Sequence, residues 1–430
     1  MKNRRKFIKS IGATLASTAL LPLGISAFEN ESNKFDTELI DELLGIDVTN
    51  DTDFWAWVQQ SYTSSTGFIN LNNGGVSPQP RQVQEAFKRY NDLSNEAPSY
   101  YMWRTLKKDL DGVKEKLASL AGVSPDEIAI NRNTTEALDT IINGLSLNKG
   151  DEIVLSKYDY PNMKSVWKMR EKRDGIVLKW IDFPVPCEDE DLLVKRFTDQ
   201  FTSKTKIVHI THLINWTGQI LPARKIADAA HNREIEVLVD GAHSFAHIDY
   251  TIPDLGCDYY GTSLHKWLCA PFGTGLLYVK KDKIAKLWPS FPNDEPGGDV
   301  ISKFENLGTR SVPAEVAIGQ AINFHLAIGA KRKQERLHEL KNYWISKVEK
   351  LPGIRIYTSK DPKFSGALAT AGIEGIEGDE LAGRLQREYQ IHVTNIQVEQ
   401  VNGVRITPHV YTRFEDLDRL VTAFEEMTQK

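Results

Sequence analysis

The sequence predicts an α/β fold, with a mostly parallel sheet sandwiched by helices and a smaller α+β C-terminal domain. From about residue 128, short apolar runs alternate with helical patterns. Such alternation is typical of parallel sheets that carry helices on both faces. After residue 314 the pattern changes to two consecutive helices, short strands and a last helix. The 430 residues suffice for more than one domain, and we expect a large domain over 67–310 and a small one over 311–430.

Each expected element follows from a local pattern in the chain. Apolar runs predict strands at 128–130, 152–156, 175–181, 206–212, 236–240, 259–263 and 274–279. Helical patterns lie between several of them, at 134–145, 161–173, 189–201 and 222–232. In the small domain we expect helices at 314–330, 332–351 and 414–428, and strands near 354–357, 366–373, 391–394 and 403–407. In parallel sheets of this kind, ligands collect at the carboxyl ends of the strands.

The first 27 residues differ from the rest of the chain. A basic segment that contains Arg4 and Arg5 precedes an apolar segment rich in small residues, with a possible cleavage after Ala27. This pattern predicts a twin-arginine signal peptide and a periplasmic mature protein, with a Sec signal or an uncleaved anchor as the alternative. Residues 28–66 are expected to form a linker and an N-terminal arm. No other window predicts a membrane span.

Charge and cysteine content exclude several classes of function. Residues 1–27 hold five basic and no acidic residues, so their removal would change the net charge from −5 to −10. An acidic protein is a poor candidate for binding nucleic acid or anionic membranes. The three cysteines form neither a disulfide framework nor a Cys-x-x-Cys metal site. No metal is expected, because His243 and His247 lack the carboxylate-bearing helix of a metal-dependent hydrolase.

An acid and a lysine follow two of the expected strands. Asp240 ends one apolar run, and Lys266 comes 26 residues later, between a strand and a Gly-rich turn. Pyridoxal 5'-phosphate (PLP) enzymes need this pair, because the lysine forms a Schiff base and the acid pairs with the pyridine nitrogen. A lysine in a dry, partly cationic pocket has a lowered pKa and becomes a nucleophile. The alternatives are a helix-capping Asp240 and a solvated Lys266.

A helix N-terminus supplies a candidate phosphate site. Asn133, Thr134, Thr135 and Glu136 open a helix directly after a strand, and Asn133 and Glu136 have the spacing of a capping box. Free N–H groups and two hydroxyls at a helix N-terminus are well suited to bind a phosphate. Plain helix capping would explain the same residues.

From about residue 68 to 428, the chain resembles the class V aminotransferase family of fold type I PLP enzymes. The segments that carry the resemblance are 71–80, 131–138, 240–244 and 265–275, and they look most like those of isopenicillin N epimerases. The resemblance implies that Lys266 carries the Schiff base, Asp240 pairs with the pyridine nitrogen, and His243 lies near the cofactor's phenolic oxygen. It also implies phosphate contacts from Ser263, His265, Thr134 and Thr135.

Four further roles are implied only by the resemblance. Tyr158 would stack on the face of the cofactor, and Asn215 would donate a hydrogen bond to its phenolic oxygen. Thr309 would reach the phosphate of the neighbouring subunit, which makes the expected active unit a homodimer. Arg405 would bind the substrate carboxylate through two parallel hydrogen bonds. Taken alone, Tyr158 could be an ordinary half-buried tyrosine, and Arg405 could be a surface residue.

The expected activity is chemistry at the α-carbon of an amino acid. Lys266 would act as the general base after releasing the cofactor, in a reaction of the epimerase type or the C–S or β-lyase type. A class V aminotransferase that passes the amino group to a keto acid is the alternative, since one set of residues can serve all three reactions. An inactive binding protein with the same fold is the non-enzyme alternative. Residues 385–404 hold no cysteine, in contrast to the mobile loop of the family's cysteine desulfurases, so persulfide chemistry is not expected.

Overall fold

The structure is a computed structural model that describes residues 51–429. The expected signal peptide (1–27) and most of the expected arm (28–66) lie outside these residues. Residues 51–61 belong to a separate unit, which contains helix α3 (Asp51–Gln60). Among the residues described, no helix is both long and apolar enough to cross a membrane. The second unit begins at Tyr62 and contains the β-sheets.

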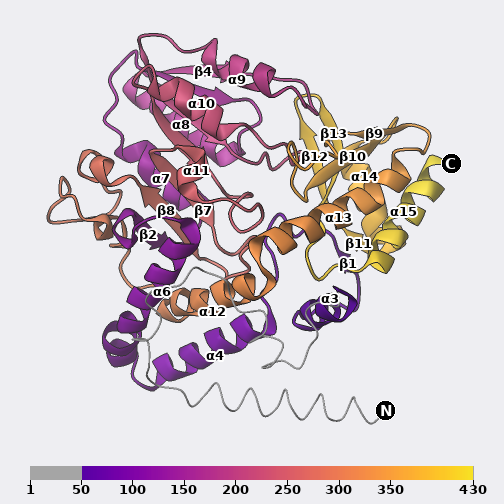
Figure 1. Cartoon of the computed structure of the whole chain (residues 1–430), viewed down its shortest axis with the longest axis horizontal. Helices are drawn as coiled ribbons and strands as arrows, with labels where there is room; N and C mark the ends of the chain where they lie inside the picture. The colour runs from indigo at the N-terminus through magenta and orange to yellow at the C-terminus, as the bar shows by residue number, and fades with distance from the viewer. Residues whose placement is uncertain (1–50, 430) are drawn as a thin grey trace. The chain divides into compact units, whose positions relative to one another are not determined.

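A seven-stranded sheet forms the centre of the larger part of this unit (Figure 1). Its strands are β2 (Ile128–Asn131), β3 (Glu152–Ser156), β4 (Val177–Ile181), β5 (Thr205–Thr211), β6 (Glu236–Asp240), β7 (Tyr259–Ser263) and β8 (Gly275–Val279). Their order across the sheet is β2-β8-β7-β6-β5-β3-β4. Within this sheet β8 runs antiparallel to both of its neighbours, and the other adjacent pairs are parallel. The expected mostly parallel sheet is therefore confirmed.

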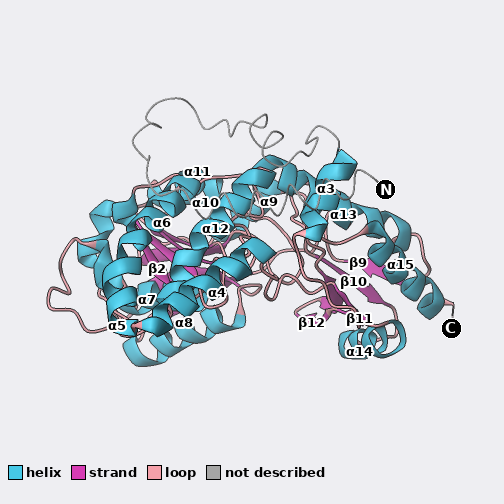
Figure 2. Cartoon of the chain, turned by 90° about the horizontal axis from the view of Figure 1, so that it is seen from below, coloured by secondary structure: helices cyan, strands magenta, loops and turns pink. Residues whose placement is uncertain are grey.

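Helices cover both faces of this sheet, as Figure 2 shows. The two faces are packed by α7 (Thr134–Gly144) and α8 (Pro161–Asp174) on one side and by α6 (Leu106–Ala121), α9 (Glu190–Thr198) and α10 (Ala223–His231) on the other. Successive side chains of a strand point to opposite faces. On β3, Ile153 and Leu155 accordingly join one hydrophobic cluster and Val154 joins the other. Burial on both faces explains why these strands read as continuous apolar runs.

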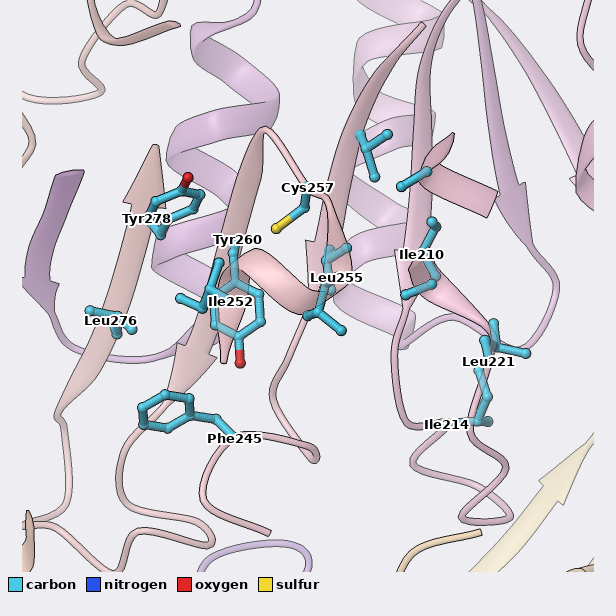
Figure 3. Packing of buried hydrophobic residues seen from close by; sticks show 14 of the residues in the cluster. Ile210, Ile214, Leu221, Phe245, Ile252, Leu255, Cys257, Tyr260, Leu276 and Tyr278 are labelled. Carbon is cyan, nitrogen blue, oxygen red and sulfur yellow. The ribbon is translucent and has the colours of Figure 1, made fainter. Parts of the chain in front are cut away.

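Figure 3 shows part of the cluster on the α10 side of the sheet. Ile210 of β5 and Tyr260 of β7 contribute to it, together with Leu255 of the short helix α11 (Ile252–Leu255). The hydroxyl groups of Tyr250 and Tyr260 form a hydrogen bond with each other, over 2.8 Å. This packing fixes β5, β6 and β7 side by side, so that their carboxyl ends share one edge of the sheet.

A smaller four-stranded antiparallel sheet lies in the C-terminal part, in the order β12-β13-β10-β9. Its elements are β9 (Ile354–Ile356), β10 (Ala369–Ile373), β12 (Thr394–Val398) and β13 (Val401–Ile406), with helices α13 (Ala330–Val348), α14 (Gly378–Tyr389) and α15 (Phe414–Thr428) packed in the same hydrophobic cluster. Thr370 of β10 stands opposite Arg405 of β13. A smaller α+β unit is thus present, as the sequence predicts, although helix α14 was not expected.

The remaining elements of this unit lie outside the two larger sheets. Strand β1 (Ile69–Asn70) pairs in parallel with β11 (Ile391–His392), next to the smaller sheet's cluster. Helix α12 (Val312–Ile328) packs on α4 (Arg81–Glu96) and on α6. The short elements are α5 (Pro98–Tyr100), the π-helix η1 (Tyr101–Thr105) and the 3₁₀ helices η2 (Pro125–Glu127), η3 (Lys281–Lys286) and η4 (Ile301–Phe304). The expected division of the chain near residue 310 stays a prediction.

Candidate active site

A pocket of about 230 Å³ lies at the shared carboxyl edge of β5, β6 and β7. It brings together eight of the residues expected in the site, namely Thr134, Thr135, Asn215, Asp240, His243, Ser263, His265 and Lys266. The carboxyl ends of parallel strands meet at one edge, and residues that are far apart in the chain become neighbours there. The pocket is therefore where the sheet topology places a ligand.

Asp240 ends β6 and is buried. One of its carboxylate oxygens, Oδ1, accepts a hydrogen bond of 2.9 Å from the amide of Ala242. Burial raises the pKa of Asp240, while the Ala242 amide and the charge of Lys266 act in the opposite direction. A buried carboxylate is stable as an ion only beside cations or hydrogen-bond donors. A protonated ring nitrogen would supply both.

Lys266 is half-buried, and its Nζ lies 3.1 Å from Nε2 of His243. Burial lowers the pKa of Lys266 to about 8, with Asp240 raising it and Arg405 lowering it further. Burial also holds the pKa of His243 well below 6.5, so the imidazole is neutral near pH 7. Its Nδ1 is buried and has no hydrogen-bond partner within the described part of the chain. The pocket thus offers a lysine that loses its proton readily, beside a neutral imidazole.

Helix α7 begins at the floor of the pocket. The amide of Thr134 donates to Oγ of Ser263 over 2.9 Å, and the two hydroxyl oxygens lie 2.7 Å apart. Asn133 caps the helix, because its side chain accepts from the amide of Glu136. The carboxylate of Glu136 accepts from the amide of Arg132, so only half of the expected capping box forms. Hydroxyls and a helix N-terminus together suit a bound phosphate.

Arg405 projects from β13 of the smaller sheet and is buried. Its two terminal nitrogens donate to the carbonyl of Asn215 and to Oδ1 of Asn72, each over 2.9 Å. Burial lowers the pKa of Arg405 to about 10, which leaves it charged at neutral pH. Nε has no acceptor among residues 51–429. The guanidinium is therefore held in place beside Asn215, with donor capacity to spare for a carboxylate.

Tyr158 does not line this pocket, contrary to the expectation that it stacks on a cofactor. It is buried against Phe183, with ring centroids 4.8 Å apart, and its hydroxyl donates to the Phe183 carbonyl over 3.3 Å. Tyr160 lines the pocket and is 40% exposed. The reason is local: Asp159 closes a tight turn after β3 by accepting from the amide of Ser156, and this turn buries Tyr158.

Thr309 is exposed and lies outside the pocket lining. Within its own chain, Thr309 therefore does not lie beside the pocket residues. Its predicted contact with a neighbouring subunit stays a prediction.

Asn133, which was expected at the start of the helix, also lines the pocket. The sequence did not indicate the other lining residues, which are Gly75, Tyr160, Met163, Thr211 and Ala242. Thr211 ends β5, and its hydroxyl donates over 2.7 Å to the buried carboxylate of Asp159, whose pKa burial raises to about 7. A polar residue at the end of an apolar strand was the available signal for Thr211, as it was for Asp240. Tyr160 stands directly before Pro161, the first residue of α8, a common start of a helix.

These residues fit PLP. Asp240 is a buried carboxylate in need of a cation, and Lys266 can lose its proton near neutral pH. The side-chain oxygen of Asn215 is buried without a partner among the described residues, so this amide can still bond a ligand. Thr134 and Ser263 stand at a helix N-terminus, where a phosphate binds. By contrast, residues 51–429 contain no cluster of three or more His, Cys, Asp or Glu side chains that could hold a metal ion.

Comparisons with known proteins identify the family of the chain. The family model for class V aminotransferases matches residues 69–420. The isopenicillin N epimerase of Amycolatopsis lactamdurans is 28% identical over 87% of this chain and 99% of its own. A probable cysteine desulfurase of Halalkalibacterium halodurans is 30% identical over 83% of this chain and 92% of its own.

Solved structures show the same fold. The cystine C–S lyase C-DES, in complex with its product cysteine persulfide, superposes with a TM-score of 0.75 at 22% identity, covering 84% of this chain and 98% of its own. The apo cysteine desulfurase of Thermococcus onnurineus superposes with a TM-score of 0.74 at 19% identity, covering 87% and 98% of the two chains. The chain belongs to the class V aminotransferase family and is a PLP-dependent enzyme of fold type I.

Proposed function

We propose that this enzyme acts at the α-carbon of an amino-acid substrate, as an epimerase or as a C–S or β-lyase, in the manner of the isopenicillin N epimerases. The observation that carries the proposal is that Lys266 and Asp240 line one pocket and that Arg405 donates to the carbonyl of Asn215, which lines it as well. Lys266 has a lowered pKa, Asp240 is buried next to it, and Arg405 stands beside the pocket residue Asn215. A base and a carboxylate anchor on either side of a ligand are what removal of an α-proton requires.

Each residue has a defined task in this proposal. Arg405 binds the α-carboxylate and thereby fixes the position of the α-proton. Lys266 in its neutral form removes that proton. PLP, when bound, withdraws the electrons left on the α-carbon. Asp240 would keep the ring nitrogen of the bound cofactor protonated, and His243 and Asn215, which line the same pocket, would help to hold the cofactor.

Cysteine desulfurase activity is not favoured for this chain. Residues 394–406 form the hairpin of β12 and β13, and residues 385–404 contain no cysteine. Cys187, Cys257 and Cys269 are all buried. Burial raises the pKa of each thiol, which disfavours the nucleophilic thiolate. Among the relatives named above, the epimerases therefore remain the better guide.

The experiment that tests the proposal is a substrate panel. The PLP-loaded enzyme is incubated in deuterated water with free amino acids, peptides with a free N-terminal amino acid, and cysteine conjugates. Deuterium at the α-carbon with inversion supports epimerisation, whereas pyruvate and ammonia support β-elimination. Keto acid formed in proportion to an added keto-acid acceptor would show an aminotransferase instead. No exchange with any member of the panel would overturn the proposal.

We also propose that the active unit is a homodimer and that the mature enzyme is periplasmic. The exposed position of Thr309 leaves it available to a second subunit. The Arg4-Arg5 pair ahead of an apolar segment supports the twin-arginine route, which transports folded proteins. A folded pocket could then be loaded with cofactor before transport.

A further inference from the structure

A buried histidine lies directly behind the active-site pocket. His247 follows His243 by four residues, is 1% exposed and does not line the pocket. Its Nδ1 lies 2.7 Å from the carbonyl oxygen of His243. Its Nε2 lies 2.8 Å from the amide nitrogen of Ala367. One imidazole therefore joins the backbone of His243 to that of Ala367, which lies 120 residues beyond His247 in the chain.

The hydrogen-bond pattern fixes the tautomer of this ring. The amide of Ala367 can only donate, so Nε2 of His247 accepts and carries no proton. In a neutral imidazole the proton then resides on Nδ1, which donates to the His243 carbonyl. Burial holds the pKa of His247 well below 6.5, so the ring stays neutral at pH 7. Both hydrogen bonds are thus permanent features of the folded protein.

The same ring contacts the neighbour of the reactive lysine. His247 stacks on Trp267 with ring centroids 3.7 Å apart and an interplanar angle of 24°. Trp267 is fully buried, adjacent to Lys266 in the chain, and stacked at 5.6 Å with His409. Its carbonyl accepts a hydrogen bond from the buried Lys333. Three buried contacts of Trp267 therefore hold the segment that carries Lys266, and the stack on His247 is one of them.

Through its Nε2 atom, His247 binds the backbone of Ala367, next to the smaller sheet. Ala367 lies two residues before β10, and Thr370 of β10 pairs with Arg405 of β13. The approach is close, because a Cβ added to Gly366 would lie 2.6 Å from Cε1 of His247. Only glycine fits there without displacing the ring. His247 thus connects the segments of His243 and Lys266 with the strand pair that carries Arg405.

We propose that His247 is a positioning residue that fixes the separation between the reactive lysine and the carboxylate-binding arginine. It touches neither substrate nor cofactor and acts through the backbones of His243 and Ala367. The proposal rests on the proposed function for the roles of Lys266 and Arg405, whereas the tether itself is a property of the fold. Without the tether, the distance between the two groups would be less well defined, and a substrate that needs both would bind more weakly.

Two variants of His247 separate its hydrogen bonds from its stacking. His247→Phe keeps a flat ring against Trp267 and loses both hydrogen bonds, whereas His247→Gln keeps a donor and an acceptor. The PLP-loaded enzymes are titrated with L-alanine and with ethylamine, followed by the visible spectrum of the cofactor. We expect the Phe variant to bind L-alanine roughly tenfold more weakly and ethylamine about as well as before, since only the amino acid needs Arg405. The Gln variant should recover most of the affinity for L-alanine.

His209→Phe is the matched control. His209 is also buried, and its Nδ1 accepts from Nε1 of Trp167 over 2.9 Å, on β5 and α8 rather than at the segment of Ala367. This control should lose stability and keep the ratio of L-alanine to ethylamine affinity. An unchanged ratio in His247→Phe, or an equal fall in His209→Phe, would overturn the proposal.

Hydrogen exchange tests the tether without substrate. The backbone amides of residues 367–373 and 403–407 should exchange faster in His247→Phe than in the wild type, and His247→Gln should restore their protection. Unchanged exchange would contradict the tether. This measurement needs no activity, so it remains decisive for the tether even if the substrate panel shows that the proposed function is wrong.

Discussion

At the scale of residues, the pocket holds Asp240 and Lys266, and burial disfavours the charged form of each. Burial raises the pKa of Asp240 and lowers that of Lys266, while the attraction between the two opposes both shifts. A ligand with a cationic ring nitrogen and an aldehyde would relieve both groups, because Asp240 gains a permanent partner and Lys266 reacts as a neutral amine. Perturbed pKa values of this kind are common where catalysis occurs.

The first prediction concerns the pH dependence of cofactor loading. Neutral amines react with aldehydes, and Lys266 has a pKa of about 8 in place of the ordinary 10.5. The lowered pKa populates the neutral form at lower pH, so the rate at which the cofactor-free protein takes up PLP should rise with pH and level off above about pH 8. Stopped-flow absorbance measures this rate. A rate that still rises steeply near pH 10 would contradict the lowered pKa.

Asp240→Asn should retain the cofactor and lose activity. An amide cannot keep the ring nitrogen protonated, and a hydrogen bond to a charged group contributes about 1.5–3 kcal/mol, so turnover should fall by roughly 10- to 100-fold. Steady-state kinetics on the best substrate of the panel give the number. Unchanged turnover would show that Asp240 is only structural.

Arg405→Lys should weaken substrate binding by about 1–3 kcal/mol, because lysine keeps the charge and loses the paired donors. Arg405 is buried, and its bonds to Asn215 and Asn72 hold the guanidinium in place. The affinities of the variant and the wild type are compared for an amino acid and for its decarboxylated amine, so that the contribution of the carboxylate is measured separately. Equal losses for both ligands would exclude a carboxylate role.

At the scale of elements, the N-terminus of α7 depends on a close approach by β8. A Cβ on Gly275 would lie 2.5 Å from Oδ1 of Asn131 and 2.7 Å from the amide of Asn133. Gly275→Ala should therefore displace the start of α7, destabilise the protein by about 1–3 kcal/mol, and weaken PLP binding through its phosphate. Gly112→Ala is the control: it lies in α6, nothing would contact its Cβ, and it should be neutral or stabilising. Thermal unfolding and PLP titration measure both effects, and unchanged PLP affinity in Gly275→Ala would contradict this account.

Much of this arrangement could be predicted from the sequence. The strands Glu152–Ser156, Glu236–Asp240 and Tyr259–Ser263 have the predicted bounds, because each is a buried apolar run between clear breaks. Asp240 and Lys266 could be found because they follow such strands. Tyr158 could not be placed, since the turn that Asp159 closes decides which tyrosine faces the pocket. The contact of Asn72 with Arg405 spans 333 residues and depends on packing alone.

At the scale of the whole molecule, two proposals concern assembly and location. If Thr309 reaches the phosphate of a neighbouring subunit, Thr309→Ala should weaken PLP binding although Thr309 lies outside the pocket of its own chain. Mixed dimers of Thr309→Ala and Lys266→Ala subunits decide the point. If the contact crosses the interface, each mixed dimer should contain one intact pocket and one pocket that carries both changes. One impaired pocket of each kind, or a monomeric enzyme in solution, would exclude the contact.

Export should depend on the arginine pair. Replacement of both Arg4 and Arg5 by lysine should retain the protein in the cytoplasm, because the twin-arginine route recognises the pair itself rather than its charge. Cell fractionation measures the distribution of the enzyme. Mature protein outside the inner membrane despite the double replacement would exclude that route.

We expect Lys266 to bind the cofactor covalently, and chemical reduction of the enzyme tests this bond. The PLP-loaded enzyme is reduced with borohydride, digested and analysed by mass spectrometry. The wild type should carry a pyridoxyl adduct on Lys266, and Lys266→Ala should keep its fold but form no adduct. An adduct on another lysine, or none in the wild type, would show that Lys266 does not carry the cofactor.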